Sequence, residues 1–89
     1  MQQTTYPVDV ISVCAADGSI RPLRLRLEDE HQQLRCIRID EILSVKDVSY
    51  VGIEAFVYLC RAVVQDRVWL FELKYMIRSH SWQLLRWGP

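Results

Sequence analysis

Residues 56–75, FVYLCRAVVQDRVWLFELKY, form the most apolar and aromatic stretch of the chain, and their pattern decides the fold. In the second half of this stretch, Trp69, Phe71, Leu73 and Tyr75 alternate with residues of mixed polarity. A period of two with one wholly apolar face is typical of a half-buried β-strand. β-Branched and aromatic residues also suit a pleated surface. We therefore predict a strand for this half.

The first half, residues 56–64, fits two different periods. Its apolar residues match a helical stripe at i, i+3 and i+4, and as a strand they are apolar on both faces. Val57, Val63 and Val64 favour the strand, because β-branched side chains are stiff at χ1. We predict a central strand and keep the helix as the alternative. The intervening Gln65-Asp66 lacks the Asn-Gly signal of a two-residue type I′ turn.

The rest of the chain indicates further short strands. In residues 16–19, Ala-Asp-Gly-Ser, the Asp-Gly pair supplies the positive φ that a hairpin turn needs. Residues 33–43 change the parity of their apolar set, which predicts a bulge near Cys36-Ile37. Residues 44–55 are expected to be a connection that holds one short helical turn. Outside the central hairpin, strands are predicted over four ranges: 8–15, 20–28, 33–43 and 82–87.

Together these segments predict an all-β fold of about six short, mainly antiparallel strands. We expect a single small domain over residues 1–89, with residues 1–6 loose. A small SH3-like or split barrel, or else a strongly curled sheet, would accommodate so many strands in so short a chain, because closure removes exposed sheet edges.

Composition limits the function classes. The chain has 89 residues, of which 51% are hydrophobic, and its 11 basic and 11 acidic residues give a formal net charge of zero. This balance argues against disorder and against strong non-specific binding to nucleic acid or anionic lipid. We expect no membrane span and see no signal peptide, because no apolar run is long enough. The cysteines are expected to be reduced core thiols of a cytoplasmic protein: Cys14, Cys36 and Cys60.

The chain shows no pattern of a catalytic or metal site. His31 and His80 sit in polar segments, and neither they nor the cysteines have CxxC or HxxxH spacing. The neighbouring carboxylates Asp40 and Glu41 would point to opposite faces of a strand, so they cannot act as a close acid–base pair. We expect no enzyme activity, no cofactor and no metal.

The order of segments resembles a family of short bacterial all-β proteins of unknown function. The similarity runs from Val10 to Trp87 through VISVCAADGSIRPLRLRLED, LRCIRIDEIL, the central hairpin with its FELKY motif, and SWQLLRW. It implies a strand for residues 56–64 and implies no function; the chain departs from the family pattern at Gln65-Asp66. The segment CIRIDEI is also faintly similar to the barrel of WYL domains of bacterial regulators, although the Trp-Tyr-Leu run is absent.

Three functional hypotheses remain. The first is a non-enzymatic protein-interaction module, which binds a partner or a second copy of itself through surface aromatic residues: Tyr58, Trp82 and Trp87. The alternative is a nucleic-acid-binding barrel whose outer face presents Arg24, Arg26, Arg35 and Arg38. The third is a small-molecule-binding barrel whose mouth is covered by residues 44–55.

Overall fold

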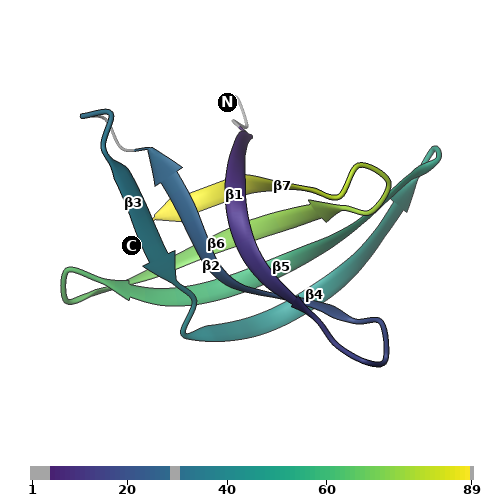
Figure 1. The fold of residues 1–89 in the computed structure, drawn as a ribbon, viewed down its shortest axis with the longest axis horizontal. Helices are drawn as coiled ribbons and strands as arrows, with labels where there is room; N and C mark the ends of the chain where they lie inside the picture. Colours follow the sequence, from purple (N-terminus) through teal and green to yellow (C-terminus); the bar gives the residue numbers. More distant parts are fainter. Residues whose placement is uncertain (1–4, 29–30, 89) are drawn as a thin grey trace.

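Seven β-strands and short turns make up the computed structural model, which describes residues 5–28 and 31–88 (Figure 1). The described part of the chain contains no helix. The strands are β1 (Tyr6–Cys14), β2 (Ile20–Glu28), β3 (Leu34–Arg38), β4 (Glu41–Tyr50), β5 (Ile53–Val64), β6 (Arg67–Met76) and β7 (Ser81–Gly88).

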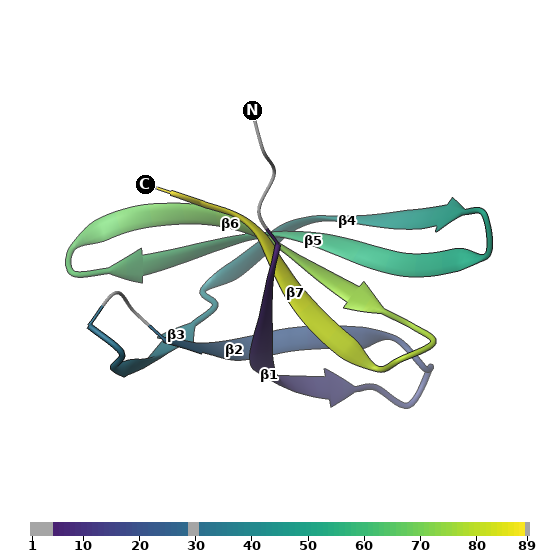
Figure 2. The same cartoon turned by 90° about the horizontal axis from the view of Figure 1, so that it is seen from above.

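The strands form one curled sheet in the order β3-β2-β1-β7-β6-β5-β4, and all neighbours are antiparallel. Strand β1 connects the two halves of this sheet, because residues 6–8 pair with β7 and residues 9–14 pair with β2. The sheet folds over at β1, so that the β1–β2–β3 layer crosses the β4–β7 layer (Figures 1 and 2). The result is a half-barrel that encloses the apolar core.

A sharp corner at Ile39 and Asp40 joins the two ends of the sheet. The Ile39 amide donates to the Leu23 carbonyl of β2, and the Asp40 amide donates to the Arg61 carbonyl of β5, each at 2.9 Å. Two neighbouring residues therefore bind strands in different layers. Through this corner, β3 and β4 are consecutive in sequence although they lie at opposite ends of the strand order.

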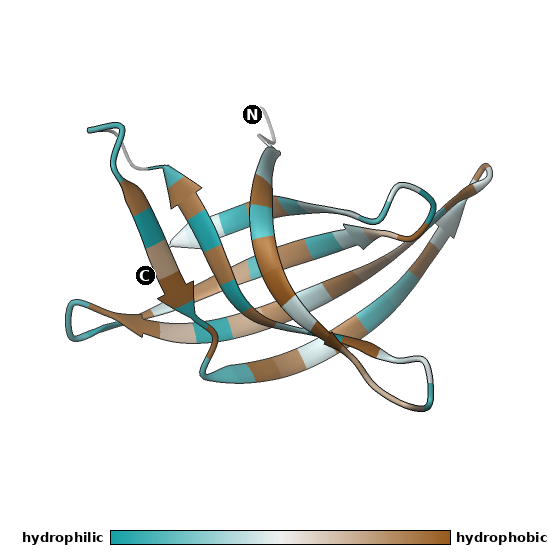
Figure 3. Cartoon of the chain, viewed as in Figure 1, coloured by the Kyte–Doolittle hydropathy of each residue, from teal (hydrophilic) through white to brown (hydrophobic). Residues whose placement is uncertain are grey.

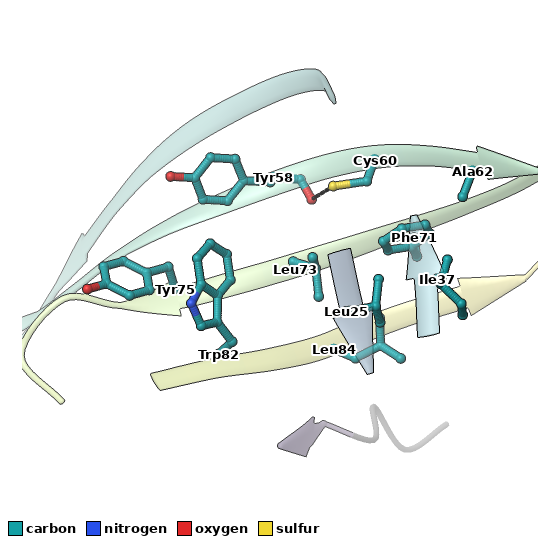
Figure 4. Close-up of a cluster of buried hydrophobic side chains, with 10 residues drawn as sticks. All are labelled: Leu25, Ile37, Tyr58, Cys60, Ala62, Phe71, Leu73, Tyr75, Trp82 and Leu84. Carbon is teal, nitrogen blue, oxygen red and sulfur yellow. Dashed lines mark hydrogen bonds between the residues drawn. The ribbon is translucent and has the colours of Figure 1, made fainter. Parts of the chain in front are cut away.

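The core confirms the strand interpretation of residues 56–64. Tyr58, Cys60 and Ala62 point from β5 toward the side chains of β6 and β7, and Leu25 and Ile37 face them from the other layer (Figure 4). These inward positions alternate with more exposed ones, as the period of two predicts. The buried cluster is completed by Phe71, Leu73, Tyr75, Trp82 and Leu84.

The structure corrects the expectations for residues 33–55. Instead of one strand with a bulge near Cys36-Ile37, β3 ends at Arg38 and the chain turns the corner into β4. A register irregularity does occur, but it lies between Ile42 and Ser44. The expected helical turn in residues 44–55 is wrong, because β4 continues to Tyr50 and a tight turn leads into β5.

Three further predictions have different outcomes in the structure. Of the residues 1–6 expected to be loose, Tyr6 belongs to β1 and pairs with Leu84, and residues 1–4 lie outside the described part of the chain. Seven strands form where about six were predicted, because the corner at Ile39 and Asp40 divides residues 33–43 between β3 and β4. The Asp-Gly turn is confirmed: Gly18 has a φ of 90°, and Asp17 accepts hydrogen bonds from the Ser19 amide and hydroxyl at 2.9 and 2.7 Å.

The β5–β6 hairpin has a two-residue turn with left-handed backbone. Val64 pairs with Arg67, and the residues between them, Gln65 and Asp66, have φ values of 52° and 63°. Positive φ at both central positions defines a type I′ turn, which glycine and asparagine favour and glutamine does not. The turn type that matches the strand twist is therefore present without its usual Asn-Gly sequence signal.

Replacing Gln65-Asp66 by Asn-Gly should stabilise the protein by about 1 kcal/mol, because the new residues adopt positive φ with less strain. Urea unfolding would measure this change. In the control Asp47→Gly, glycine replaces an exposed residue of β4 with ordinary strand geometry, and stability should fall by roughly 0.5–1 kcal/mol. If the Asn-Gly variant lost as much stability as Asp47→Gly, the assigned turn would be contradicted.

The three cysteines differ in burial. Cys60 is fully buried, and burial raises the pKa of its thiol to about 12. Cys14 and Cys36 are exposed on β1 and β3, so the expectation that all three are core thiols is wrong for these two.

Only Cys14 and Cys36 should react rapidly with a thiol reagent at pH 8 in the folded protein. Cys60 should react on unfolding, since the thiolate is the reactive form and is disfavoured in the core. Mass spectrometry of alkylated protein, with and without denaturant, would show this difference. Rapid labelling of Cys60 in the native state would contradict its burial.

Candidate functional site

The aromatic residues expected at the surface are divided by the fold. Tyr58 and Trp82 are 3% and 7% exposed, with ring centroids 5.5 Å apart, so both belong to the core and the surface prediction is wrong for them. The Tyr58 hydroxyl donates to the Ile20 carbonyl, and burial raises the pKa of this phenol. Trp87 remains 37% exposed and stacks on Trp69, with ring centroids 4.5 Å apart.

The four arginines expected to share one face are also divided. The register of β2 and β3 pairs Arg24 with Arg38, and Arg26 with Cys36, so Arg24, Arg26 and Arg38 lie on the outer face of this layer. Arg35 pairs with Leu27, one position out of phase, and belongs to the opposite face. Figure 3 shows the alternation of hydrophilic and hydrophobic residues along β2 that produces this separation.

On this outer face, the charge of Arg26 is balanced by a carboxylate, whereas the charges of Arg24 and Arg38 are not. The Arg26 guanidinium donates to a carboxylate oxygen of Asp9 at 2.6 Å, and this bond raises the pKa of Arg26. The side chains of Arg24 and Arg38 form no hydrogen bond or ion pair with another described residue. They occupy directly opposed positions, where like charges destabilise the sheet.

Strand β3 presents an open backbone edge next to these arginines. Because Ile39 donates to Leu23, the alternation of an antiparallel ladder directs the amides of Ile37 and Arg35 toward β2. The backbone groups of the residues between them therefore point away from β2. No other described strand pairs with this edge. The residues whose backbone groups point to this open edge are Leu34, Cys36 and Arg38.

A recess of about 420 Å³ lies along this open edge. One wall is β3, from Arg35 to Arg38, and the other is the end of β5 with the following turn, from Val63 to Gln65. The two walls diverge from the corner, where an Asp40 carboxylate oxygen accepts a hydrogen bond from the Val63 amide at 3.1 Å. We call this recess, together with the open edge of β3, the seam.

The surface beside the seam is partly apolar. Val63 and Val68 form a cross-strand pair and are 49% and 47% exposed, and Leu70 on the same face of β6 is 46% exposed. On β3, Leu34 is 65% exposed. The seam therefore combines unpaired backbone groups with apolar side chains, which are the features that strand addition to a sheet edge uses, and it also carries positive charge.

The described residues also bear on other kinds of site. They contain no group of three or more His, Cys, Asp and Glu side chains placed to hold a metal ion. His80 lies 2.9 Å from the Tyr75 hydroxyl through its Nδ1 atom, in the turn before β7. No helix in the described ranges is long and apolar enough to cross a membrane.

Comparison with protein-family models, curated proteins and solved structures finds no significant match for this chain. The resemblance to short bacterial all-β proteins therefore stays a prediction.

Arg38→Gln should raise the free energy of unfolding by roughly 0.2–1 kcal/mol, because it removes the charge opposed to Arg24. The gain should shrink at high salt, which screens exposed charges. Chemical denaturation at low and high salt would measure both effects. Arg67→Gln is the control, because it removes a charge at the exposed start of β6. The expected change in its free energy of unfolding is near zero. A loss of stability in Arg38→Gln would contradict the repulsion.

Proposed function

We propose that this protein is a non-enzymatic interaction module that binds an extended segment of a protein by adding it as a strand to β3. The observation that carries the proposal is the open edge of β3, whose outward backbone groups border a recess of about 420 Å³. Strand addition is a common mode of peptide recognition, in which backbone hydrogen bonds provide affinity and alternate side chains provide specificity.

The seam suits an added strand on both of its faces. A strand paired with β3 would place alternate side chains on the outer face, beside Leu34, Cys36 and Arg38. The intervening side chains would point to the inner face, where the partly buried Val64 lines the recess. Burying the half-exposed Val63 and the remaining surface of Val64 would contribute apolar stabilisation, and pairing would satisfy the open backbone groups.

The structure favours this site over the sequence hypothesis of surface aromatics. Two of the three aromatic residues are in the core, which leaves Trp87 as the exposed one. The nucleic-acid hypothesis gains little support from the arrangement, because Arg35 lies on the other face and Arg26 is paired with Asp9. A single-strand binding platform needs aromatic rings beside its cationic groups, but Trp82 is buried, and Trp87 stacks on Trp69 in the layer that does not contain β2 and β3.

Cys36→Pro should abolish strand addition while it preserves the fold. Proline removes the Cys36 amide hydrogen, which points away from β2, so no ladder bond is lost and proline is tolerated at such an edge. The test is selection of binders from a library of displayed random peptides, followed by affinity measurement. Selected peptides should bind the wild type and Cys36→Ala, and they should lose at least about tenfold in affinity for Cys36→Pro, which loses a backbone hydrogen bond and meets steric conflict.

Ile37→Pro is the matched control for the ladder, because its amide points toward β2 and its loss should unfold or strongly destabilise the protein. Hydrogen exchange should also show protection of the Cys36 and Arg38 amides when peptide is bound. A library without binders, or peptides that bind Cys36→Pro as tightly as the wild type, would overturn the proposal. Binding of a second copy of this chain at β3 would appear as a dimer in sedimentation that Cys36→Pro dissociates.

A further inference from the structure

The pair formed by Arg24 and Arg38 stands next to the position that an added strand would occupy. Their positions oppose each other as a pair that does not exchange backbone hydrogen bonds, which is the arrangement with the closest side chains, about 4.5 Å between Cα atoms. Both residues are exposed. Like charges on directly opposed residues repel each other, and an anion bound between them would offset the repulsion.

Two carboxylates close to this pair in register or in sequence have other partners. Asp9 lies on the same outer face but binds Arg26 at 2.6 Å. Asp40, two residues after Arg38, accepts the Val63 amide at the corner. The positive charge of Arg24 and Arg38 is therefore not compensated by these side chains, and it is available to a group from outside the chain.

The register of strand addition determines which residue of the partner would meet this charge. The backbone of Arg38 points to the open edge, so the partner residue opposite it would exchange hydrogen bonds with it, about 5.5 Å away between Cα atoms. Opposed residues share a face, and the partner's side chain would therefore lie on the outer face beside Arg38. Strand β2 is two strand spacings away, about 9.6 Å, which the long Arg24 side chain can span in part.

We infer that the strand bound at β3 carries an aspartate or glutamate opposite Arg38, and that the guanidinium groups of Arg38 and Arg24 together bind its carboxylate. This inference rests on the proposed function and specifies the chemistry of the partner. A planar guanidinium binds a carboxylate through two parallel hydrogen bonds, which gives direction as well as attraction. A protein carboxylate fits better than a nucleic-acid phosphate, because the open edge offers backbone pairing that a nucleic acid cannot use.

The test uses a peptide selected for binding to the seam and its synthetic variant with glutamine in place of the acidic residue. We expect selected peptides to contain an acidic residue at one fixed position. The wild type should bind the acidic peptide roughly tenfold more tightly than the glutamine variant at low salt, as a charge-assisted pair predicts. In Arg38→Gln this preference should fall to less than about twofold, and in Arg24→Gln it should fall partially.

Arg21→Gln is the control, because Arg21 lies on β2 opposite Val13, away from β3, and the preference should be kept. Equal affinity of the wild type for the two peptides would overturn the inference, and Cys36→Pro would still decide separately whether the seam binds a strand. Competition by a single-stranded oligonucleotide that Arg38→Gln abolishes would also overturn it, since a phosphate would then be the natural occupant of the arginine pair.

Discussion

The corner at Ile39 and Asp40 is the constraint on which the rest of the structure depends. Two adjacent amides bind carbonyl groups in different layers, so two consecutive peptide units fix where the β1–β2–β3 layer meets β5. The core can then be filled from both sides, with Leu25 and Ile37 packed against the side chains of β5, β6 and β7. The same corner leaves the end of β5 without β4 beside it, and the seam opens there. Core closure and the candidate binding site thus have a common origin.

The regular part of the fold could be predicted because the pattern was local. Strand β2 was predicted with its observed bounds, and the alternating residues of β6 gave the correct inner face. The corner could not be predicted from residues 33–43, because a parity change fits a bulge and a change of layer equally well. Strand β4 is mostly exposed, and an exposed edge strand lacks the apolar alternation that would distinguish it from a connection.

The candidate site was predictable only in part, and for a related reason. Arginines at alternate positions of β2 identify one face from sequence alone, but the face of Arg35 depends on the register with Leu27. Tyr58 and Trp82 were placed at the surface because burial of aromatic side chains depends on packing between distant strands. The open edge of β3 has no sequence signal at all, since it is defined by the absence of a neighbour among the described strands.

The strand order also has a consequence for how the protein folds. Every neighbouring pair of strands is consecutive in sequence except β1 and β7, which pair Tyr6 with Leu84 near the two ends of the described chain. Local hairpins form with little loss of chain entropy, whereas joining distant segments must overcome the entropy of a long loop. We therefore expect β1 and β7 to meet late in folding. Until they do, the nascent sheet stays open at its middle, with Leu84 and Val10 not yet covered, and the chain is at that moment most prone to associate wrongly with its neighbours.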